Sequence, residues 1–161
     1  MSDFNLAEYD SFCKVIHETK LLFDDLLELE NKKIDAISVN DVDLLDQYMN
    51  EENVFLMQMR GLDFKREKMQ EQLGAKGLTF REIIDKFDGL EKDNLNNLYD
   101  GLSVKSQELK DAIGSVKRLI DMHLYSISEL LDKLEGKEGI YNKDGEKPPA
   151  EPPARFTPTK A

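Results

Sequence analysis

The sequence predicts an all-α protein: an antiparallel bundle of three long helices and one short helix, coiled-coil-like in its packing, with a disordered Pro-rich C-terminal tail. Three observations support this fold class. All five prolines lie at or after Pro148, so none interrupts residues 1–147. Those residues are rich in Leu, Glu, Lys and Asp, and their apolar members recur at intervals of three and four. A chain of 161 residues is also long enough for one domain with a substantial core.

The first helix is expected at about residues 4–38. Its apolar residues recur at heptad-like steps, and charged residues occupy the other faces. These apolar residues are Phe12, Ile16, Phe23, Leu26, Leu27, Ile34 and Ile37. Glu30 interrupts the stripe at an inward-looking step. We interpret it as a residue at the edge of the seam with its carboxylate in solvent. The alternative is a buried polar residue that sets the helix register.

The second helix is expected at about residues 42–73, with Asn40 or Asp41 as its N-cap. The connection to the first helix is short, so the two should form an antiparallel hairpin. Counting outward from the turn pairs Ile34 with Tyr48, Leu27 with Phe55, and Phe23 with Met59. Gly61 falls mid-helix, where glycine costs about 1 kcal/mol relative to alanine. We therefore expect another helix to approach closely there.

Gly74 is expected just beyond the end of the second helix. Thr79 and Glu82 then have the spacing of a capping box, which predicts a short helix at about residues 80–87. The third long helix should follow at about residues 91–134.

The third long helix carries two neighbouring rows of apolar residues. The first row runs from Leu98 to Leu134 at mostly three- and four-residue steps, and one such row packs a helix against one neighbour. The second row, one residue along, comprises Ile113, Ile120, Leu124 and Leu131. A face this broad needs either two neighbouring helices or one neighbour and a binding partner.

Composition changes after Gly136. Glycines surround Ile140 and Tyr141, and a Pro-Pro-Ala-Glu-Pro-Pro-Ala stretch begins at Pro148. Such a segment favours extended, solvated chain. We therefore expect a helical bundle domain at residues 1–136 and a flexible tail at residues 137–161.

The formal net charge of −11 argues against nucleic-acid binding, because little positive charge is available to neutralise phosphates. It argues equally against an anionic membrane surface. No apolar run is long enough to cross a bilayer, and the N-terminus lacks the features of a signal peptide. Cys13 is the only cysteine, so no intrachain disulfide can form. These features predict a cytoplasmic protein, and the charge favours a monomer.

Motifs for catalysis or cofactor binding are absent from the sequence. There is no Gly-rich phosphate loop, no His or Cys cluster for a metal and no nucleophile elbow. We therefore expect no enzymatic activity, no cofactor and no metal. His17 has Lys20 three residues later, a spacing similar to that of histidine phosphotransfer domains, but Leu21 follows where that family has a small residue. We interpret His17 as a surface histidine and keep phosphotransfer as a lesser alternative.

Several motifs follow one another in a defined order: the Asn/Asp turn at Asp41, Arg66 and Met69 ahead of Leu73-Gly74, the short capped helix, the long helix ending Ile127-Ser-Glu-Leu-Leu-Asp-Lys-Leu134, and Tyr141 four residues before Gly145. This order resembles the FlgN family, flagellar type III export chaperones for the hook-associated junction proteins. The resemblance covers about residues 21–145. One departure concerns the third long helix: Ile113 and Val116 stand where many members carry two asparagines.

The resemblance implies a non-enzymatic bundle that binds the C-terminal segments of hook-associated junction proteins, prevents their premature assembly and delivers them to the export gate. The client would lie on the apolar face of the third long helix. We expect it at Ile113, Val116, Ile120, Leu124, Ile127 and Leu131. The alternative for this row is ordinary burial within the bundle. The resemblance also implies gate docking through Tyr141, which could instead fold back on the bundle. A structural coiled-coil adaptor without an export role, self-associating through its hairpin, is the main competing function.

Overall fold

A computed structural model describes residues 5–136, and every regular element in that range is helical. The helices are α1 (Leu6–Ser38), α2 (Val42–Gln72), α3 (Phe80–Ile84) and α4 (Gly89–Leu134). The chain divides into two compact units, Met1–Ile120 and Asp121–Ala161, and α4 contributes to both. The predicted fold class, with three long helices and one short one, is confirmed.

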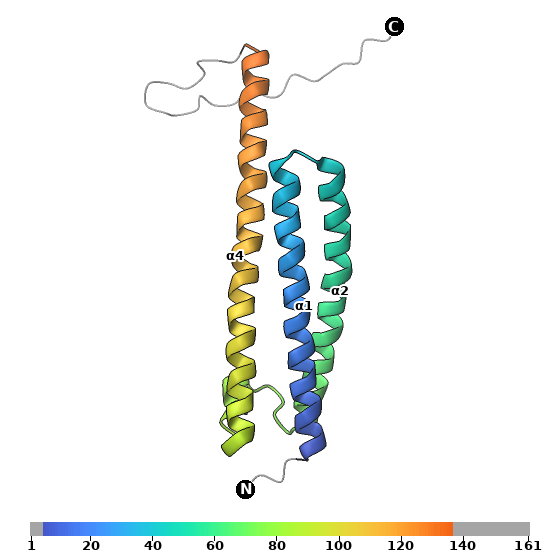
Figure 1. The fold of residues 1–161 in the computed structure, drawn as a ribbon, viewed down its shortest axis with the longest axis vertical. Coiled ribbons are helices and arrows are strands. Elements are labelled where there is room, and N and C mark those ends of the chain that lie inside the picture. Colours follow the sequence, from blue (N-terminus) through green and yellow to red (C-terminus); the bar gives the residue numbers. More distant parts are fainter. Residues whose placement is uncertain (1–4, 137–161) are drawn as a thin grey trace, which may run out of the picture. The chain divides into compact units, whose positions relative to one another are not determined.

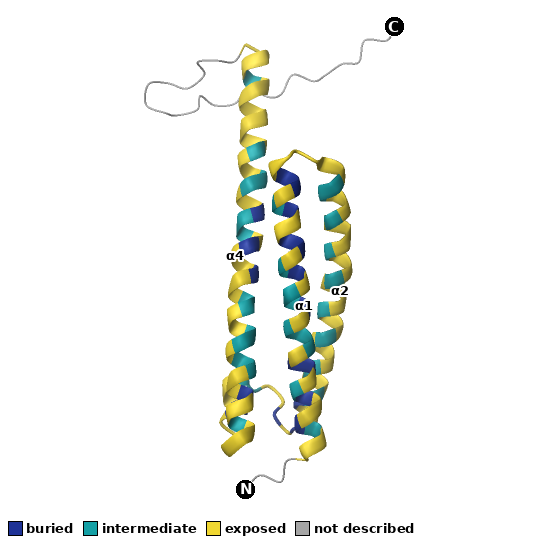
Figure 2. Ribbon diagram, viewed as in Figure 1, coloured by how far each residue is buried: buried dark blue, intermediate teal, exposed yellow. Residues whose placement is uncertain are grey.

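Helix α1 lies in the middle of the first unit, between α2 and the part of α4 up to Ile120 (Figure 1). It therefore buries residues along two sides and contributes more buried residues than any other helix (Figure 2). One core cluster joins α1 to α3 and the start of α4, and Phe12 and Leu95 are at its centre with almost no exposed surface. This arrangement makes α1 the element on which the others pack.

A second core cluster, higher along α1, contains Leu22 and Leu26 together with Leu109 of α4. The predicted hairpin register pairs Phe23 with Met59 and Leu27 with Phe55, and all four residues pack against this second cluster. The expected register of the α1–α2 hairpin is thus consistent with the observed packing.

The turn between α1 and α2 has the chemistry expected from the sequence. Asn40 adopts a positive φ of 56°, a conformation that Asn tolerates better than most residues. The Asp41 side chain accepts a hydrogen bond of 3.0 Å from the Leu44 amide and so caps α2. The predicted N-cap is confirmed, and the chain reverses within three residues.

The interpretation of Glu30 as a solvated edge residue is wrong. Its side chain is buried, with 1% of the residue exposed. The Lys33 Nζ atom lies 3.1 Å from Glu30 Oε1 and 2.7 Å from Glu52 Oε2, so one ammonium bridges two carboxylates between α1 and α2. Burial, with the neighbouring Glu52, raises the pKa of Glu30 to about 7. The carboxylate can be buried because Lys33 comes from the same helix and is buried with it.

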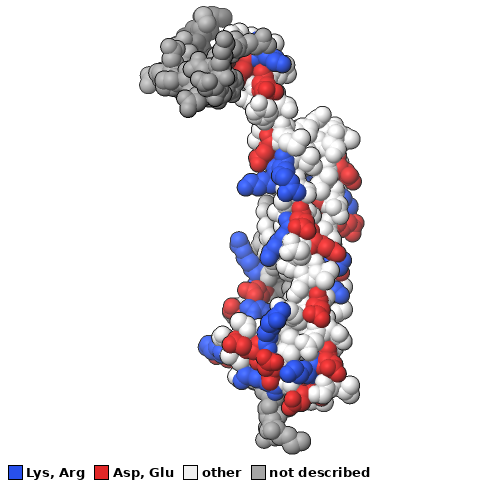
Figure 3. Space-filling view, turned by 90° about the vertical axis from the view of Figure 1, so that its left-hand side faces the viewer, with Lys and Arg blue, Asp and Glu red and all other residues white. Residues whose placement is uncertain are grey.

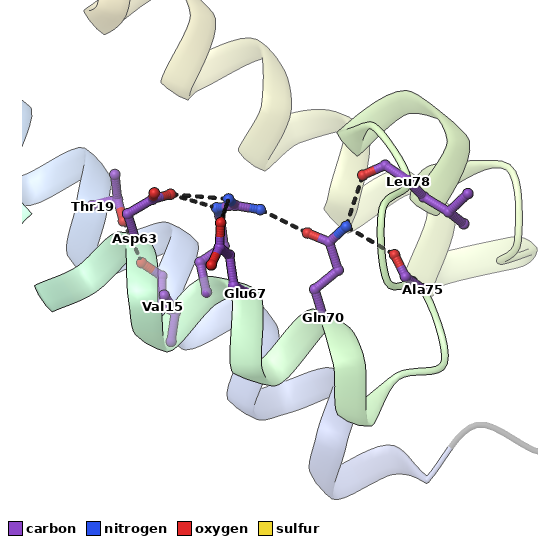
Figure 4. A network of polar contacts seen from close by, with 8 residues as sticks. Val15, Thr19, Asp63, Glu67, Gln70, Ala75 and Leu78 are labelled. Carbon is purple, nitrogen blue, oxygen red and sulfur yellow. Dashed lines mark hydrogen bonds and ion pairs between the residues drawn. The ribbon is translucent and has the colours of Figure 1, made fainter. Parts of the chain in front are cut away.

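A polar network closes the C-terminal end of α2 (Figure 4). The buried Gln70 side chain donates to the carbonyl oxygens of Ala75 and Leu78 at 2.8 and 2.7 Å, and it accepts from Arg66 at 2.7 Å. Gly74 has the positive φ, 68°, expected of the residue that ends a helix. The loop after α2 is therefore fixed to the helix by side-chain hydrogen bonds.

Helix α3 is shorter than predicted and α4 begins earlier. The capping box between Thr79 and Glu82 is present as expected. The helix nevertheless ends at Ile84, and the chain turns so that the buried Phe87 ring lies 5.3 Å from the Tyr9 ring. Gly89, with a φ of 59°, then starts α4 two residues before the expected position. The packing of Phe87 on α1, rather than local helix propensity, sets both boundaries.

Candidate functional site

The apolar content of α4 is buried in its first part and exposed in its last part. In the first unit, α4 buries Leu95, Leu109, Ala112 and Val116. In the second unit, none of residues 121–134 is buried, and that end of α4 is coloured almost entirely as exposed in Figure 2. The exposed apolar residues there are Met122, Leu124, Tyr125, Ile127, Leu130, Leu131 and Leu134. This is a long apolar helix surface, and such surfaces typically bind other protein chains.

The six predicted client-binding residues differ in their exposure. Leu124, Ile127 and Leu131 are all more than half exposed and belong to the second unit. In the first unit, Ile113 is about half exposed and Ile120 is half-buried. Val116, with 5% of its surface exposed, is a bundle residue. Tyr141, the predicted gate-docking residue, lies outside the described residues.

Acidic groups predominate among the charges on the last part of α4. Asp121, Glu129 and Asp132 lie there with one basic residue, Lys133. The Tyr125 hydroxyl donates to the Glu129 carboxylate at 3.0 Å, a contact between successive turns of the helix. On the face shown in Figure 3, Lys and Arg side chains are interspersed with Asp and Glu and form no continuous basic area. This excess of acidic side chains on the last part of α4 favours a partner that carries basic residues.

An apolar stripe on the outer face of α2 is the main feature that the sequence reasoning missed. Val54, Met57 and Phe64 are exposed, Phe64 by 72%, and they share a helix face with Gly61. The prediction that Gly61 marks a close helix approach is wrong, because a Cβ atom added there would meet nothing within 4 Å. The three- and four-residue spacing around Gly61 was the available signal. The opposite face of α2 carries a second apolar stripe, interrupted by Glu52 and Arg66, and this stripe packs on α1 through Phe55, Met59 and Leu62.

Residues 5–136 contain no group of three or more His, Cys, Asp or Glu side chains placed to hold a metal ion. His17 is exposed on α1, as expected for a surface histidine. None of the helices in this range combines the length and apolar content that a membrane-spanning helix requires.

The chain was compared with models of protein families. The family model described as FlgN protein matches residues 1–149 of the 161 in the chain. The chain belongs to the FlgN family. No curated protein and no solved structure matches it.

Membership of the FlgN family confirms the resemblance inferred from the order of the helix signals. FlgN proteins are flagellar export chaperones, a class that binds flagellar proteins rather than catalysing a reaction. The three long helices and the exposed apolar end of α4 are consistent with that role, because a chaperone of this class needs a surface to which another chain can bind.

Proposed function

We propose that this FlgN-family protein binds the C-terminal segments of hook-associated junction proteins in the cytoplasm, prevents their premature assembly and delivers them to the type III export gate. The observation that carries the proposal is the exposure of Leu124, Ile127 and Leu131 on the last part of α4. A client segment would fold into an amphipathic helix and lay its apolar anchors against these side chains.

The expected affinity is moderate. Burying apolar surface stabilises the complex by about 25 cal/mol per Å², but the client must lose the conformational freedom of a disordered segment when it folds. That ordering cost is about 2–5 kcal/mol, which keeps the complex reversible. Reversibility suits a chaperone that must release its client at the gate. Of the six residues predicted from the sequence, Val116 contributes to the bundle core, and the proposed contacts are at the remaining five.

The proposal places gate docking at Tyr141, on the basis of the family resemblance. A single aromatic side chain can provide most of the affinity of a small interface when it fills a pocket on the partner. Replacing Tyr141 with alanine should leave client binding unchanged and reduce export, measured as secreted junction protein.

The direct test is calorimetric titration with peptides from the C-terminal segments of junction proteins. The double variant Leu124→Asp/Ile127→Asp should bind at least about tenfold more weakly, because each aspartate places a charge against an apolar anchor. Val104→Asp is the control for adding an aspartate to α4: Val104 is exposed to a similar extent, but it lies in the first unit and is not a proposed client contact. Circular dichroism should show unchanged helix content in both. Undiminished binding by the double variant would contradict the proposed surface.

A structural coiled-coil adaptor remains the second candidate function. The observation that favours it is the exposed stripe of Val54, Met57 and Phe64 on the outer face of α2, which could mediate self-association of the hairpin. Sedimentation velocity distinguishes the two. A stable dimer that is lost in Met57→Asp, in a protein that binds no junction-protein segment, would favour the adaptor.

A further inference from the structure

A groove in the first unit is lined by none of the residues proposed to bind the client. Two adjoining hollows, of about 380 and 410 Å³, share Phe23, Phe80 and Leu102 in their lining. The first is bounded further by α2, through residues that include Met59 and Arg60. The second is bounded by α4 residues from Tyr99 to Lys110. Together they form an open groove over α1, between α2 and α4.

The floor of this groove is apolar and held in place. Phe23, Phe80 and Leu102 are half-buried rather than fully covered. The Phe80 ring lies 5.7 Å from the Phe12 ring and 5.3 Å from the Tyr99 ring, so its position is fixed from both sides. A half-covered and rigid apolar floor can bind a partner without an ordering cost of its own.

The charges on the groove walls are mainly positive, in a chain whose net charge is −11. The side chains of Arg60 on α2 and Lys110 on α4 have no hydrogen bond or ion pair to any residue that the structure describes. Arg66 is positioned by Asp63 at 2.9 Å and by the Gln70 network. The free charges on the two walls are therefore cationic, and they would complement an acidic ligand.

The dimensions favour a helix as the ligand. The α4 wall spans Tyr99 to Lys110, which at 1.5 Å per residue is on the order of 16 Å, or about three helical turns. Compact sites for small molecules usually combine an apolar cavity with converging buried polar groups. Here the two hollows share an apolar floor and are lined by the long helices α2 and α4, as in grooves that bind helices.

We propose that this groove binds a short amphipathic helix of another protein, about three turns long, whose apolar face packs on Phe23, Phe80 and Leu102 and whose flanking acidic side chains pair with Arg60 and Lys110. This binding is separate from the proposed client surface. It uses none of the five proposed client contacts, and it selects for acidic rather than basic flanks. Either proposal can fail without the other.

The test uses the full chain and two labelled helical peptides of about 15 residues. Both carry leucines at helical spacing on one face and alanines elsewhere; one has glutamates beside the leucines and the other has lysines. The titrations use the Leu124→Asp/Ile127→Asp variant, in which the proposed client surface cannot bind either peptide. Fluorescence anisotropy should show that the glutamate peptide binds at least about tenfold more tightly, with a preference that weakens as salt is added. Equal binding, or tighter binding of the lysine peptide, would overturn the proposal.

Two variants locate the binding. Arg60→Glu/Lys110→Glu should remove or reverse the preference for the glutamate peptide. Lys68→Glu/Lys117→Glu is the matched control, because it changes the net charge equally on the exposed surfaces of the same two helices. An equal effect in both double variants would mean that net charge alone determines the peptide preference, and would refute binding in the groove.

Ser106→Trp tests the groove sterically, because Ser106 lines it without belonging to the core clusters. The Ser106→Trp variant should keep its helix content and lose binding of the glutamate peptide. The Leu124→Asp/Ile127→Asp variant should still bind that peptide. The wild-type chain could instead self-associate and bind neither peptide. If Ser106→Trp abolished that self-association, a second copy of the chain would be the occupant of the groove, and the acidic helix would be ruled out as its ligand.

Discussion

Replacing Glu30 with glutamine should stabilise the protein at pH 8, by an amount that shrinks as the pH falls toward 4.5. Glutamine has nearly the shape of a protonated glutamic acid but cannot ionise. At pH 8 the wild-type protein must keep an ionised carboxylate in a buried site that it shares with Glu52, while Lys33 supplies only one positive charge. The variant removes the surplus negative charge and keeps the 2.7 Å pair between Lys33 and Glu52.

The magnitude follows from the pKa of Glu30, which burial raises from its ordinary value of 4.5 to about 7. The folded state therefore holds a proton that the unfolded state releases. The resulting stability is fully present below pH 4.5 and is lost as the pH rises through 7. At about 1.4 kcal/mol per pH unit, the loss amounts to at most about 3 kcal/mol. The variant also gives up the contact between Lys33 and the Glu30 carboxylate, so we expect a net gain of about 1–3 kcal/mol at pH 8.

The assay is urea unfolding followed by circular dichroism at pH 5, 6, 7 and 8. Ionisable groups away from this site affect the wild-type protein and the variant alike, so the difference between the two free energies of unfolding reports on Glu30 together with its partners Lys33 and Glu52. Glu28→Gln is the matched control: Glu28 lies on the same helix, and its exposed side chain pairs with Lys32 at 3.2 Å. It should change the free energy of unfolding by less than about 1 kcal/mol. If Glu30→Gln destabilises the protein equally at pH 5 and pH 8, Glu30 is ionised throughout and held by Lys33, and the reasoning is refuted.

Three further predictions concern stability and use the same unfolding assay. Leu95→Ala, at a residue with no exposed surface, should cost about 2–5 kcal/mol, and a loss below 1 kcal/mol would mean that the core near α3 is loosely packed. Gly61→Ala should stabilise by about 0.5–1 kcal/mol, since it adds a methyl group to open space in a helix; a loss would indicate a contact at this site. Gln70→Glu should cost about 1–3 kcal/mol at pH 7, because a carboxylate cannot donate to the Ala75 and Leu78 carbonyls, and protonation in acid should recover part of this. A pH-independent effect would argue against that explanation.

Local signals in the sequence were sufficient to predict the helices and most of their ends. The side chain of Asp41 caps α2, Gly74 ends it, and Thr79 with Glu82 starts α3. Each of these signals acts through hydrogen bonds or backbone conformation within a few residues, so no knowledge of the rest of the fold was needed. The end of α3 could not be predicted in this way, because it depends on Phe87 packing against Tyr9.

The candidate site was predicted only in part. Apolar spacing correctly indicated that α4 has more apolar surface than one neighbour can cover, but spacing alone could not separate the buried Val116 from the exposed Leu124. Val116 is buried within the first unit, whereas Leu124 belongs to the second unit and is exposed there. For the same reason, the sequence did not reveal that Phe64 is exposed or that Glu30 is buried.

The sequence by itself determined the all-α class, the order of the four helices and the family, because helix propensity, capping and apolar period are properties of neighbouring residues. Only the tertiary structure decided which apolar faces are covered, how Lys33 makes the burial of Glu30 tolerable and where a groove forms over Phe23 and Phe80. Burial and charge pairing join residues that are distant in the chain, so they become visible only when the helices are placed together.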